Sequence, residues 1–400
     1  MQINSNEIEF LVGDFDILSN MTNIPVLPAF SDIAVSFLSE LSKELLGDKR
    51  TRQHVDVVSY AYWIRRASLA AVRNKHLDYK NRLGRGVAFH VAPSNVPVNF
   101  AVSMTSSVLA GNINVIRLSD KQFEQVNIIC DGINKLLNNK FMSLKPYFCI
   151  VRYAHNELIT RELSAMCDVR IIWGGNRTIE TIRKEDIPPR AIEMTFADRF
   201  SVAIINSEKY LKSDIKETAK GFYTDTYYTD QNACSSPRII IWTGSKINEA
   251  KEVFWNELKA LVERDYDMKP IQAVDKYTSF CSLAMSLSDG CLNKSEDNLI
   301  VRIELDKLSP DIMDYKNGGG YFFEYNAKSL SEIVPILTKQ CQTISFLGES
   351  KEEIREIVFK NGVRGVDRIV PLGQTMGLEF IWDGYKMIEN MSRFIYSGEY

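Results

Sequence analysis

The chain has 400 residues, 45% hydrophobic and 25% charged, a composition typical of a globular protein with room for two or three domains. The net charge of −3 gives no broad basic field, so nucleic acid is not an expected partner. No window approaches 18 consecutive apolar residues, and the first 20 residues lack the basic and apolar regions of a secretory signal. We therefore expect no membrane span and a cytoplasmic location.

Metal-binding and common hydrolytic motifs are missing from the sequence. The seven cysteines are scattered and never fall in C-x-x-C spacing, which favours reduced thiols. The four histidines form neither H-x-x-x-H nor H-E-x-x-H, so no metal site is expected. No G-x-S-x-G elbow and no phosphate-binding G-x-x-x-x-G-K loop occurs.

The first 80 residues are expected to be mainly helical. Residues 32–47 carry apolar side chains at helical spacing and end at Gly47, a typical C-terminal stop. Residues 59–74 show the same spacing and predict a second helix.

Short apolar runs alternate with helical stretches from about residue 85. The runs that predict strands are 87–92, 113–118, 148–153, 169–174 and 201–206. They are rich in Val and Ile and largely unalternating, as strands buried on both faces should be. Strand, helix and strand in series predict right-handed crossovers and a parallel sheet. We expect a domain boundary just after 201–206. Further on, Ser350 and Glu353 have capping-box spacing at the start of a helix over 350–362.

The stretch TDQNACSSPR, residues 229–238, places Cys234 among small polar side chains. A nucleophilic thiol needs partial exposure and neighbours that favour the thiolate. A polar loop or helix start provides the exposure and also a backbone N–H that can hold an oxyanion. From residue type alone, two interpretations stand: a nucleophile and a structural loop cysteine.

Asn95 follows the strand predicted at 87–92 and precedes a helix of small and apolar residues. It is an uncharged amide donor at the carboxyl end of a strand, where open α/β sheets place their ligands. The alternative is that Asn95 only caps the next helix. This segment alone leaves the two interpretations open.

Two further groups follow predicted strands at the same edge. Arg117 and Asp120 end a strand, where an arginine and an acid can bind the ribose or phosphate of a nucleotide, or form a solvated surface pair. Gly174 and Gly175 stand between a strand and a helix, where helix N–H groups can meet a pyrophosphate, or where the glycines form a plain tight turn.

The order of these segments resembles that of the aldehyde dehydrogenase superfamily. The matching stretches are APSNVP (92–97), AGNINVIRLSD (110–120), IIWGGN (171–176) and DQNACSSPR (230–238). Within that superfamily, QNACSSP around Cys234 and GVDRIVPLGQTMGLEFIWDGY (365–385) resemble the LuxC-type acyl-CoA reductases, the bacterial fatty-acid reductases. The resemblance covers roughly residue 80 to the end and is much weaker before it.

The resemblance implies an α/β fold of the aldehyde dehydrogenase type, with two Rossmann-like domains, parallel sheets and a mainly helical N-terminal segment. The expected parts are a helical segment 1–80 packing on the cofactor domain, a nicotinamide-cofactor-binding domain 81–206, a catalytic domain 207–365 with the cysteine loop, and a C-terminal segment 366–400 returning toward the cofactor domain.

The resemblance also implies roles for the candidate residues. Cys234 would be the nucleophile, and Asn95 with the backbone N–H of Cys234 would form the oxyanion hole. Arg117 would hold the adenosine ribose region of the cofactor, with Asp120 beside it. Gly174 and Gly175 would lie near the pyrophosphate.

Two segments depart from the superfamily pattern. The glutamate-bearing ELGGK-like segment of the hydrolysing enzymes is replaced by AIEMTFADRFS (191–201), in which Glu193 remains but the glycines are gone. The EIFGP-like segment that holds the nicotinamide ribose has no recognisable counterpart near NGGGYFFEY (317–325). An oxidising enzyme must activate water, whereas a thioester reductase must exclude it, so these losses favour the reducing direction.

The expected reaction is NADPH-dependent reduction of a fatty acyl thioester to the aldehyde through an acyl-Cys234 intermediate. NADH is the alternative cofactor, because Asp120 would repel a 2′-phosphate that Arg117 and Lys121 would attract. The acyl donor would be acyl-CoA or an acylated carrier or synthetase protein, and the superfamily implies a homo-oligomer. Two other hypotheses stand: an NAD(P)-dependent aldehyde dehydrogenase in which Glu193 activates water, and a degenerate, non-catalytic binding subunit.

Overall fold

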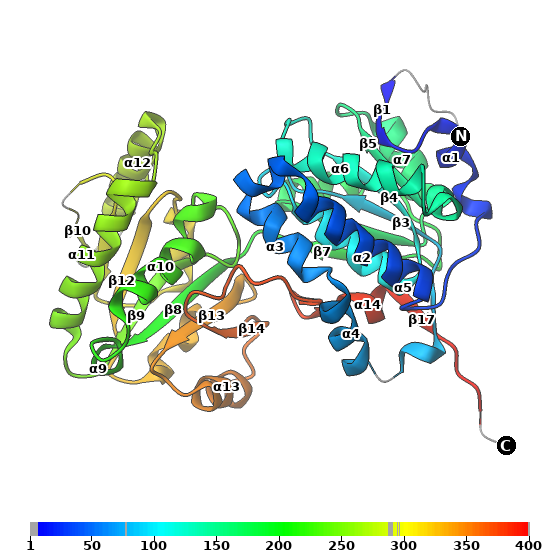
Figure 1. Cartoon of the computed structure of the whole chain (residues 1–400). Coiled ribbons are helices and arrows are strands. Elements are labelled where there is room, and N and C mark those ends of the chain that lie inside the picture. Colours follow the sequence, from blue (N-terminus) through cyan, green and yellow to red (C-terminus); the bar gives the residue numbers. More distant parts are fainter. Residues whose placement is uncertain (1–6, 77, 287–290, 294, 296, 399–400) are drawn as a thin grey trace. The chain divides into compact units, whose positions relative to one another are not determined.

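The computed structural model describes residues 7–76, 78–286, 291–293, 295 and 297–398. The chain divides into two compact units, Met1–Ala197 with Leu378–Tyr400, and Asp198–Gly377. Each unit contains its own mainly parallel sheet with helices, so the expected α/β class with parallel sheets is confirmed (Figure 1).

The sheet of the first unit has six strands in the order β1-β5-β4-β3-β6-β7. In chain order they are β1 (Glu9–Val12), β3 (Val87–Val91), β4 (Ile113–Leu118), β5 (Phe148–Arg152), β6 (Val169–Trp173) and β7 (Ile192–Phe196). All neighbouring strands are parallel except β1, which pairs antiparallel with β5 at one edge. β3, β4, β5 and β6 confirm the strands predicted from their unalternating Val and Ile runs.

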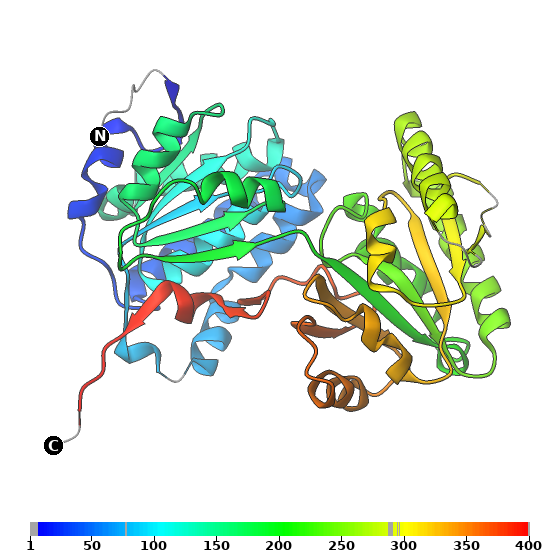
Figure 2. The ribbon, with the colours of Figure 1, turned by 180° about the vertical axis from the view of Figure 1, so that it is seen from behind.

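Helices cover both faces of this sheet. They are α1 (Phe15–Asn20), α2 (Asp32–Gly47), α3 (Val55–Trp63), α4 (Arg66–Lys75), α5 (Asn99–Ala110), α6 (Glu124–Leu137), α7 (Glu157–Ala165), α8 (Asn176–Ile182) and α14 (Met387–Met391), with 3-10 turns η2 (Met21–Asn23), η3 (Lys49–Gln53), η4 (Tyr79–Asn81) and η5 (Met142–Tyr147). α2 packs over α5 and α6 on one face (Figure 1), and α7 and α8 cover the other face (Figure 2). α5 is almost wholly buried because its residues are small or apolar all round.

The Ala-Gly-Asn sequence after α5 has a structural role. Gly111 ends the helix at φ +93°, and a Cβ there would lie 2.0 Å from the carbonyl oxygen of Leu27, so only glycine fits. The Asn112 side chain accepts from the backbone N–H of Arg85 (2.7 Å) and donates to the carbonyl of Met391 (2.9 Å). This motif therefore joins the start of β3 to α14 near the end of the chain.

The second unit has a seven-stranded sheet in the order β10-β11-β12-β9-β8-β13-β14. The strands are β8 (Phe200–Asn206), β9 (Pro237–Thr243), β10 (Cys291–Asn293), β11 (Val301–Leu305), β12 (Tyr321–Asn326), β13 (Cys341–Leu347) and β14 (Arg368–Pro371). The helices are α9 (Ser207–Tyr210), α10 (Ile215–Asp225), α11 (Ile247–Asp265), α12 (Pro270–Ser286) and α13 (Lys351–Lys360), with 3-10 turns η6 (Tyr227–Thr229), η7 (Pro310–Tyr315) and η8 (Leu330–Ile336). Only β10 runs antiparallel to its neighbour. Separate apolar clusters pack on the two faces of this sheet.

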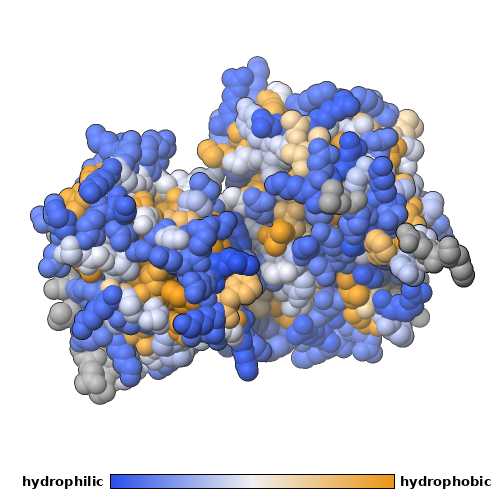
Figure 3. All heavy atoms as spheres, turned by 90° about the horizontal axis from the view of Figure 1, so that it is seen from below, coloured by the Kyte–Doolittle hydropathy of each residue, from blue (hydrophilic) through white to orange (hydrophobic). Residues whose placement is uncertain are grey.

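Two short ribbons complete the first unit: β2 (Arg82–Gly84) pairs with β17 (Ser392–Phe394), and β15 (Ile381–Trp382) pairs with β16 (Tyr385–Lys386). Among the described residues, no helix has the length and apolar character needed to span a membrane. The face drawn in Figure 3 is mainly hydrophilic, with hydrophobic atoms in small separate groups.

Several element predictions are confirmed and others are corrected. The helix at 32–47 is α2, and Ser350 caps α13 by accepting from the Glu353 N–H at 3.3 Å. The single helix expected at 59–74 is wrong: α3 and α4 are separate because Arg65 has extended backbone angles (φ −65°, ψ 152°). β1 and β7 had not been predicted.

The expected domain boundary after residue 206 is also wrong. β8 pairs with β9 and β13 of the second unit, so the first part ends at Ala197. The apolar run of β8 resembles those of the strands before it, so the sequence alone does not show that it belongs to the second sheet. The expected C-terminal segment 366–400 is divided: β14 and the loop to Gly377 belong to the second unit, and Leu378 onward packs in the first.

Candidate active site

The first unit has a topological switch point between β3 and β6. The chain leaves β3 toward β4 and β5 and then returns to add β6 on the other side of β3. Ligands of open α/β sheets bind outside the carboxyl ends of the strands at such a point. The loop with Asn95 follows β3, and the turn Gly174-Gly175 follows β6, so both predicted segments lie at the switch point.

Asn95 is exposed in its loop. In the part of the chain that the structure describes, its side chain has no hydrogen-bond partner. The N-cap of α5 is Val98 and no side chain caps it, so the helix-capping alternative is wrong. The amide of Asn95 is therefore available to a ligand.

A buried network under this edge was missed by the sequence reasoning. The Oγ of Ser103 on α5 lies 2.8 Å from His90 Nδ1 and accepts from Trp173 Nε1 at 3.1 Å. Burial lowers the pKa of His90 to about 3, so its imidazole is neutral. The rings of Trp173 and Phe196 are stacked, with their centres 3.6 Å apart. α5 thus fixes the ends of β3 and β6 together.

Arg117 and Asp120 lie at the same sheet edge but form no ion pair with each other among the described residues. The guanidinium of Arg117 stands 4.9 Å from the ring centre of Tyr153, and Asp120 is exposed. A small, largely apolar pocket opens between the loops after β3 and β4; its lining includes Ala92, Pro93, Val96, Pro97, Phe100 and Leu118. Its free volume of about 10 Å³ is room for about one water molecule and Arg117 does not line it, so a nucleotide site at this edge stays a prediction.

Gly174 and Gly175 form the tight connection from β6 to α8. A Cβ on Gly174 would lie 3.0 Å from the Thr178 side chain, so glycine permits the close turn. Gly175 is the N-cap of α8 without a side-chain bond. The geometry accounts for a tight turn, and the pyrophosphate role stays a prediction.

Glu193 lies on β7 in a network of ion pairs. Its Oε2 is 2.6 Å from Arg170 Nη2, and its Oε1 is 2.6 Å from Arg183 Nε. Arg170 is 3% exposed and also donates to the carbonyls of Ile182 and Glu185. Both carboxylate oxygens of Glu193 are therefore held by cations that tie β6, β7 and α8 together.

Cys234 lies in the second unit, in the turn that leads into β9, and its thiol is half-buried. The turn begins with Asp230 and Gln231, both in the left-handed region at φ +52° and +57°. Ser201 Oγ donates to the carbonyl of Cys234 at 2.7 Å. Four cysteines of the described residues are by contrast fully buried: Cys130, Cys149, Cys167 and Cys341.

Gln231 fastens this turn to β12. It is fully buried; its amide donates to the carbonyls of Pro237 and Tyr321, and its Oε1 accepts from the N–H groups of Gly320 and Tyr321 at 2.9 and 3.0 Å. All of its hydrogen-bonding capacity is used internally. Gln231 therefore has a structural role in the turn that carries Cys234.

Two cations near Cys234 were not recognised from the sequence. Arg238 on β9 and Lys316 line an open pocket of about 430 Å³ together with Asn317, Gly318 and residues of α12. Burial lowers the pKa of both cations, and the negative charge of a Cys234 thiolate acts in the opposite direction. Because such interactions are mutual, both cations favour the thiolate.

The loop after β14 reaches the cysteine turn. Ser235 Oγ contacts Met376 Sδ at 3.7 Å. The loop is held by Asp225, which accepts from the N–H groups of Gly373 (2.6 Å) and Thr375 (3.0 Å). Part of the 365–385 stretch thus forms a loop that contacts the cysteine turn, a role that the family resemblance alone does not show.

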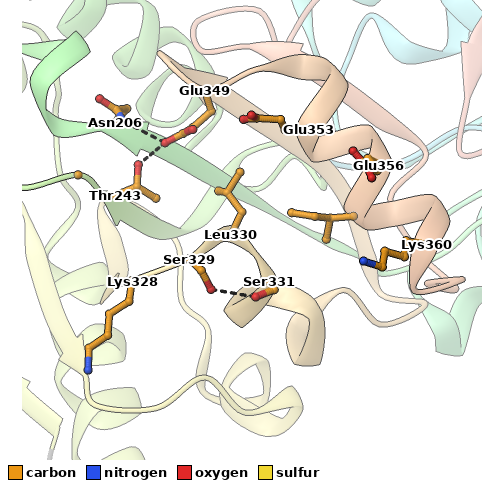
Figure 4. A pocket seen from close by; sticks show the side chains of 12 residues that line it. Asn206, Thr243, Lys328, Ser329, Leu330, Ser331, Glu349, Glu353, Glu356 and Lys360 are labelled. Atoms are coloured by element: carbon orange, nitrogen blue, oxygen red, sulfur yellow. Dashed lines mark hydrogen bonds between the residues drawn. The ribbon is translucent and has the colours of Figure 1, made fainter.

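A larger pocket, about 490 Å³, lies at the opposite end of β9 (Figure 4). There Glu349 accepts hydrogen bonds from Asn206 and Thr243, while Glu353 and Lys360 stand on α13. Cys234 lies just before the amino end of β9, whereas Thr243 is the last residue of this strand. The two ends of β9 are about 20 Å apart. This pocket contains none of the predicted site residues.

The candidate residues therefore fall into two sets. Asn95, Arg117, Asp120, Gly174 and Gly175 lie at the carboxyl ends of the strands of the first unit, whereas Glu193 is the second residue of β7 and lies near the amino end of that strand. Cys234 and its cations belong to the second unit.

The fold is that of the aldehyde dehydrogenases. A lactaldehyde dehydrogenase structure is similar with a TM-score of 0.67 at 12% identity, over 94% of this chain and 88% of the other. An NAD-dependent benzaldehyde dehydrogenase from Corynebacterium glutamicum gives 0.62 at 11% identity, over 98% and 95%.

The family model described as acyl-CoA reductase (LuxC) matches residues 22–394, and the chain belongs to this family. It is similar to a protein named long-chain acyl-protein thioester reductase 2 from Photobacterium leiognathi (26% identity; 48% of this chain, 38% of the relative). It is also similar to a long-chain acyl-protein thioester reductase from Aliivibrio fischeri (24% identity; 72% and 58%). The chain thus spans less than two thirds of the length of these curated relatives.

Proposed function

We propose that the chain is a fatty acyl thioester reductase that releases an aldehyde through an acyl-Cys234 intermediate. The observation that carries the proposal is the position of Cys234, a half-buried thiol on a pre-shaped polar turn beside two cations. Membership of the acyl-CoA reductase family and the thioester reductase names of its relatives support the substrate class.

The Cys234 thiolate attacks the thioester carbonyl carbon and forms a new C–S bond. The tetrahedral oxyanion is stabilised by the amide of Asn95 and the Cys234 N–H, and its collapse breaks the bond to the donor sulfur, which leaves as a thiolate. A reduced nicotinamide, when bound, supplies the hydride that the acyl carbon accepts. Collapse of the second oxyanion then breaks the C–S bond and releases the aldehyde and the Cys234 thiolate.

The residues of the first unit suit a nicotinamide dinucleotide. Arg117 lies on β4 and Gly174-Gly175 follows β6, so both stand at the carboxyl ends of the strands, where open α/β sheets bind their ligands. We propose NADPH as the cofactor, since Arg117 and Lys121 offset the exposed Asp120 at a 2′-phosphate. NADH is the alternative cofactor. If the protein uses NADH, removal of Asp120 should weaken its binding.

The pairing of Glu193 supports the reducing direction. Acid formation requires a carboxylate free to activate water, and both oxygens of Glu193 are engaged by Arg170 and Arg183. This engagement counts against the aldehyde-oxidising hypothesis. The non-catalytic hypothesis does not explain why Cys234 is partly exposed on a polar turn near two cations. The acyl donor is an acylated protein or acyl-CoA, and homo-oligomerisation stays a prediction.

The test is to mix the purified protein with acyl-CoAs of different length and NADPH or NADH, and to follow nicotinamide absorbance and aldehyde directly. Cofactor consumption with aldehyde release that Cys234→Ala abolishes is the expected result. Wild-type rates in Cys234→Ala would refute the mechanism. If no acyl-CoA is reduced, a mass increase on Cys234 after incubation with acyl-CoA separates an enzyme that needs a protein donor from a binding subunit.

A further inference from the structure

Arg238 carries a buried charge without an ion-pair partner. It lies on β9, four residues after Cys234, and is 8% exposed. Its two terminal nitrogens donate to the backbone carbonyls of Gln231 and Asn317. Across the described residues, no carboxylate forms an ion pair with Arg238, and its Nε is buried without a hydrogen-bond partner.

A buried guanidinium is expensive unless an anion compensates it. Burial lowers the pKa of Arg238 to about 10, and Cys234 is the group that raises it. Carbonyl dipoles solvate part of the charge but cannot neutralise it. A thiolate at Cys234, four residues before Arg238 in the same turn, would be an anion that compensates this charge.

The same guanidinium joins the turn that carries Cys234 to a second segment, residues 317–320. Gln231 belongs to that turn and Asn317 opens the glycine run 317–320, which lies against it. The N–H of Gly319 donates to the carbonyl of Asp230 at 2.8 Å. A Cβ on Gly318 would approach the same carbonyl oxygen to 2.6 Å. The glycines of NGGG thus allow residues 317–320 to lie close to the backbone of the cysteine turn, and Arg238 bonds to both segments.

We propose that Arg238 is a positioning residue for Cys234: it clamps the nucleophile turn to the glycine run and supplies the fixed counter-charge that keeps the thiol ionised. The inference rests on the proposed function, because it assigns Cys234 as the nucleophile. It assigns to Arg238 a role that the resemblance does not supply.

The other charged groups around this site do not replace Arg238. Lys316 is exposed, and Asp198 and Asp314 act on its charge besides Cys234. Asp275 on α12 lines the pocket from the solvent side, and Asp230 accepts from Tyr266 at 2.7 Å. The compensated, exposed Lys316 is therefore expected to influence Cys234 less than the uncompensated, buried Arg238.

The test measures the pH dependence of Cys234 alkylation by iodoacetamide, read by mass spectrometry of its peptide, in the full-length protein. In the wild type the midpoint should lie at least about one pH unit below the ordinary thiol value near 8.5. Arg238→Met should raise it by about one unit or more, Arg238→Lys should restore part of the shift, and Lys316→Met should change it less. Arg85→Met, which removes an arginine that donates to the carbonyl of Asn390 in the first unit, should leave the midpoint unchanged.

A midpoint in Arg238→Met that superimposes on the wild-type value would overturn the proposal, as would a wild-type midpoint at or above 8.5. If Arg238→Met does not fold, the wild-type midpoint and the Arg238→Lys profile decide. Wild-type reductase activity in Cys234→Ala would instead refute the proposed function, whatever the thiol titration shows.

Discussion

Glu193 and Arg170 form an ion pair on adjacent strands, with Oε2 and Nη2 2.6 Å apart and Arg170 buried beneath the sheet edge. This pairing favours a structural role for Glu193. A carboxylate whose two oxygens are bound by arginines is not free to remove a proton from water, and its removal would leave a buried arginine uncompensated.

The first prediction is that Glu193→Gln loses stability and keeps the reductase reaction. Removing one partner of a buried pair leaves Arg170 uncompensated, which costs about 3 kcal/mol. Urea unfolding should show the loss, while kcat for aldehyde formation, measured where the variant is folded, should stay within about threefold. A folded Glu193→Gln variant that accumulates acyl-enzyme and no longer forms acid from an aldehyde would instead support the oxidising hypothesis.

The second prediction concerns Asn95, whose exposed amide has no internal partner in the described chain. Asn95→Ala should lower kcat by roughly 10²–10³-fold, the usual effect of one oxyanion donor. Asn95→Asp, of the same shape, should lower it further because a carboxylate repels the oxyanion. Thermal unfolding should be unchanged in both, since no internal bond is lost. Equal kcat in the wild type and Asn95→Ala would remove Asn95 from the mechanism.

The third prediction is a pH dependence of stability from Asp225. The residue is fully buried, and burial raises its pKa from 3.8 to about 6 despite the N–H donors of Gly373 and Thr375. The folded chain therefore binds this proton more tightly than the unfolded chain. The resulting stabilisation is complete below about pH 3.8 and is lost as the pH rises through 6, a change of about 3 kcal/mol.

Asp225→Asn removes this titration. The difference in unfolding free energy between wild type and Asp225→Asn, measured in urea at several pH values, should fall as the pH rises from 4 to 6.5. A difference that is constant over this range would show that Asp225 titrates in the folded protein as it does in the unfolded chain.

Local patterns in the sequence predicted much of the fold and the candidate residues, for identifiable physical reasons. Strands buried on both faces need continuous Val and Ile runs, so β3 to β6 are visible in the sequence. Cys234 stands out because its neighbours are polar. The break between α3 and α4 had no such signal, since the residues around Arg65 keep the apolar spacing of a single helix.

The rest depends on residues far apart in the sequence. Asn112 bonds to the carbonyl of Met391, 279 positions away, so the purpose of the Ala-Gly-Asn motif is not visible locally. The pairing of Glu193 depends on the alignment of β7 with β6, and the charge of Arg238 matters only because the fold buries it. Local patterns thus locate residue types, and tertiary structure decides whether each one is free to react.

The last prediction uses the glycine run beside the nucleophile turn. Gly318→Ala adds a Cβ that would lie 2.6 Å from the backbone oxygen of Asp230, so one of the two segments must move. Overpacking of this kind costs about 1–3 kcal/mol, and here the displaced segment carries Cys234. We expect a lower kcat and slower alkylation of Cys234 in the folded variant. The matched control is Gly47→Ala, because a Cβ at Gly47 meets no atom within 4 Å, and activity should be unchanged. Wild-type kcat and alkylation in Gly318→Ala would show that the turn keeps its reactive shape without this close contact.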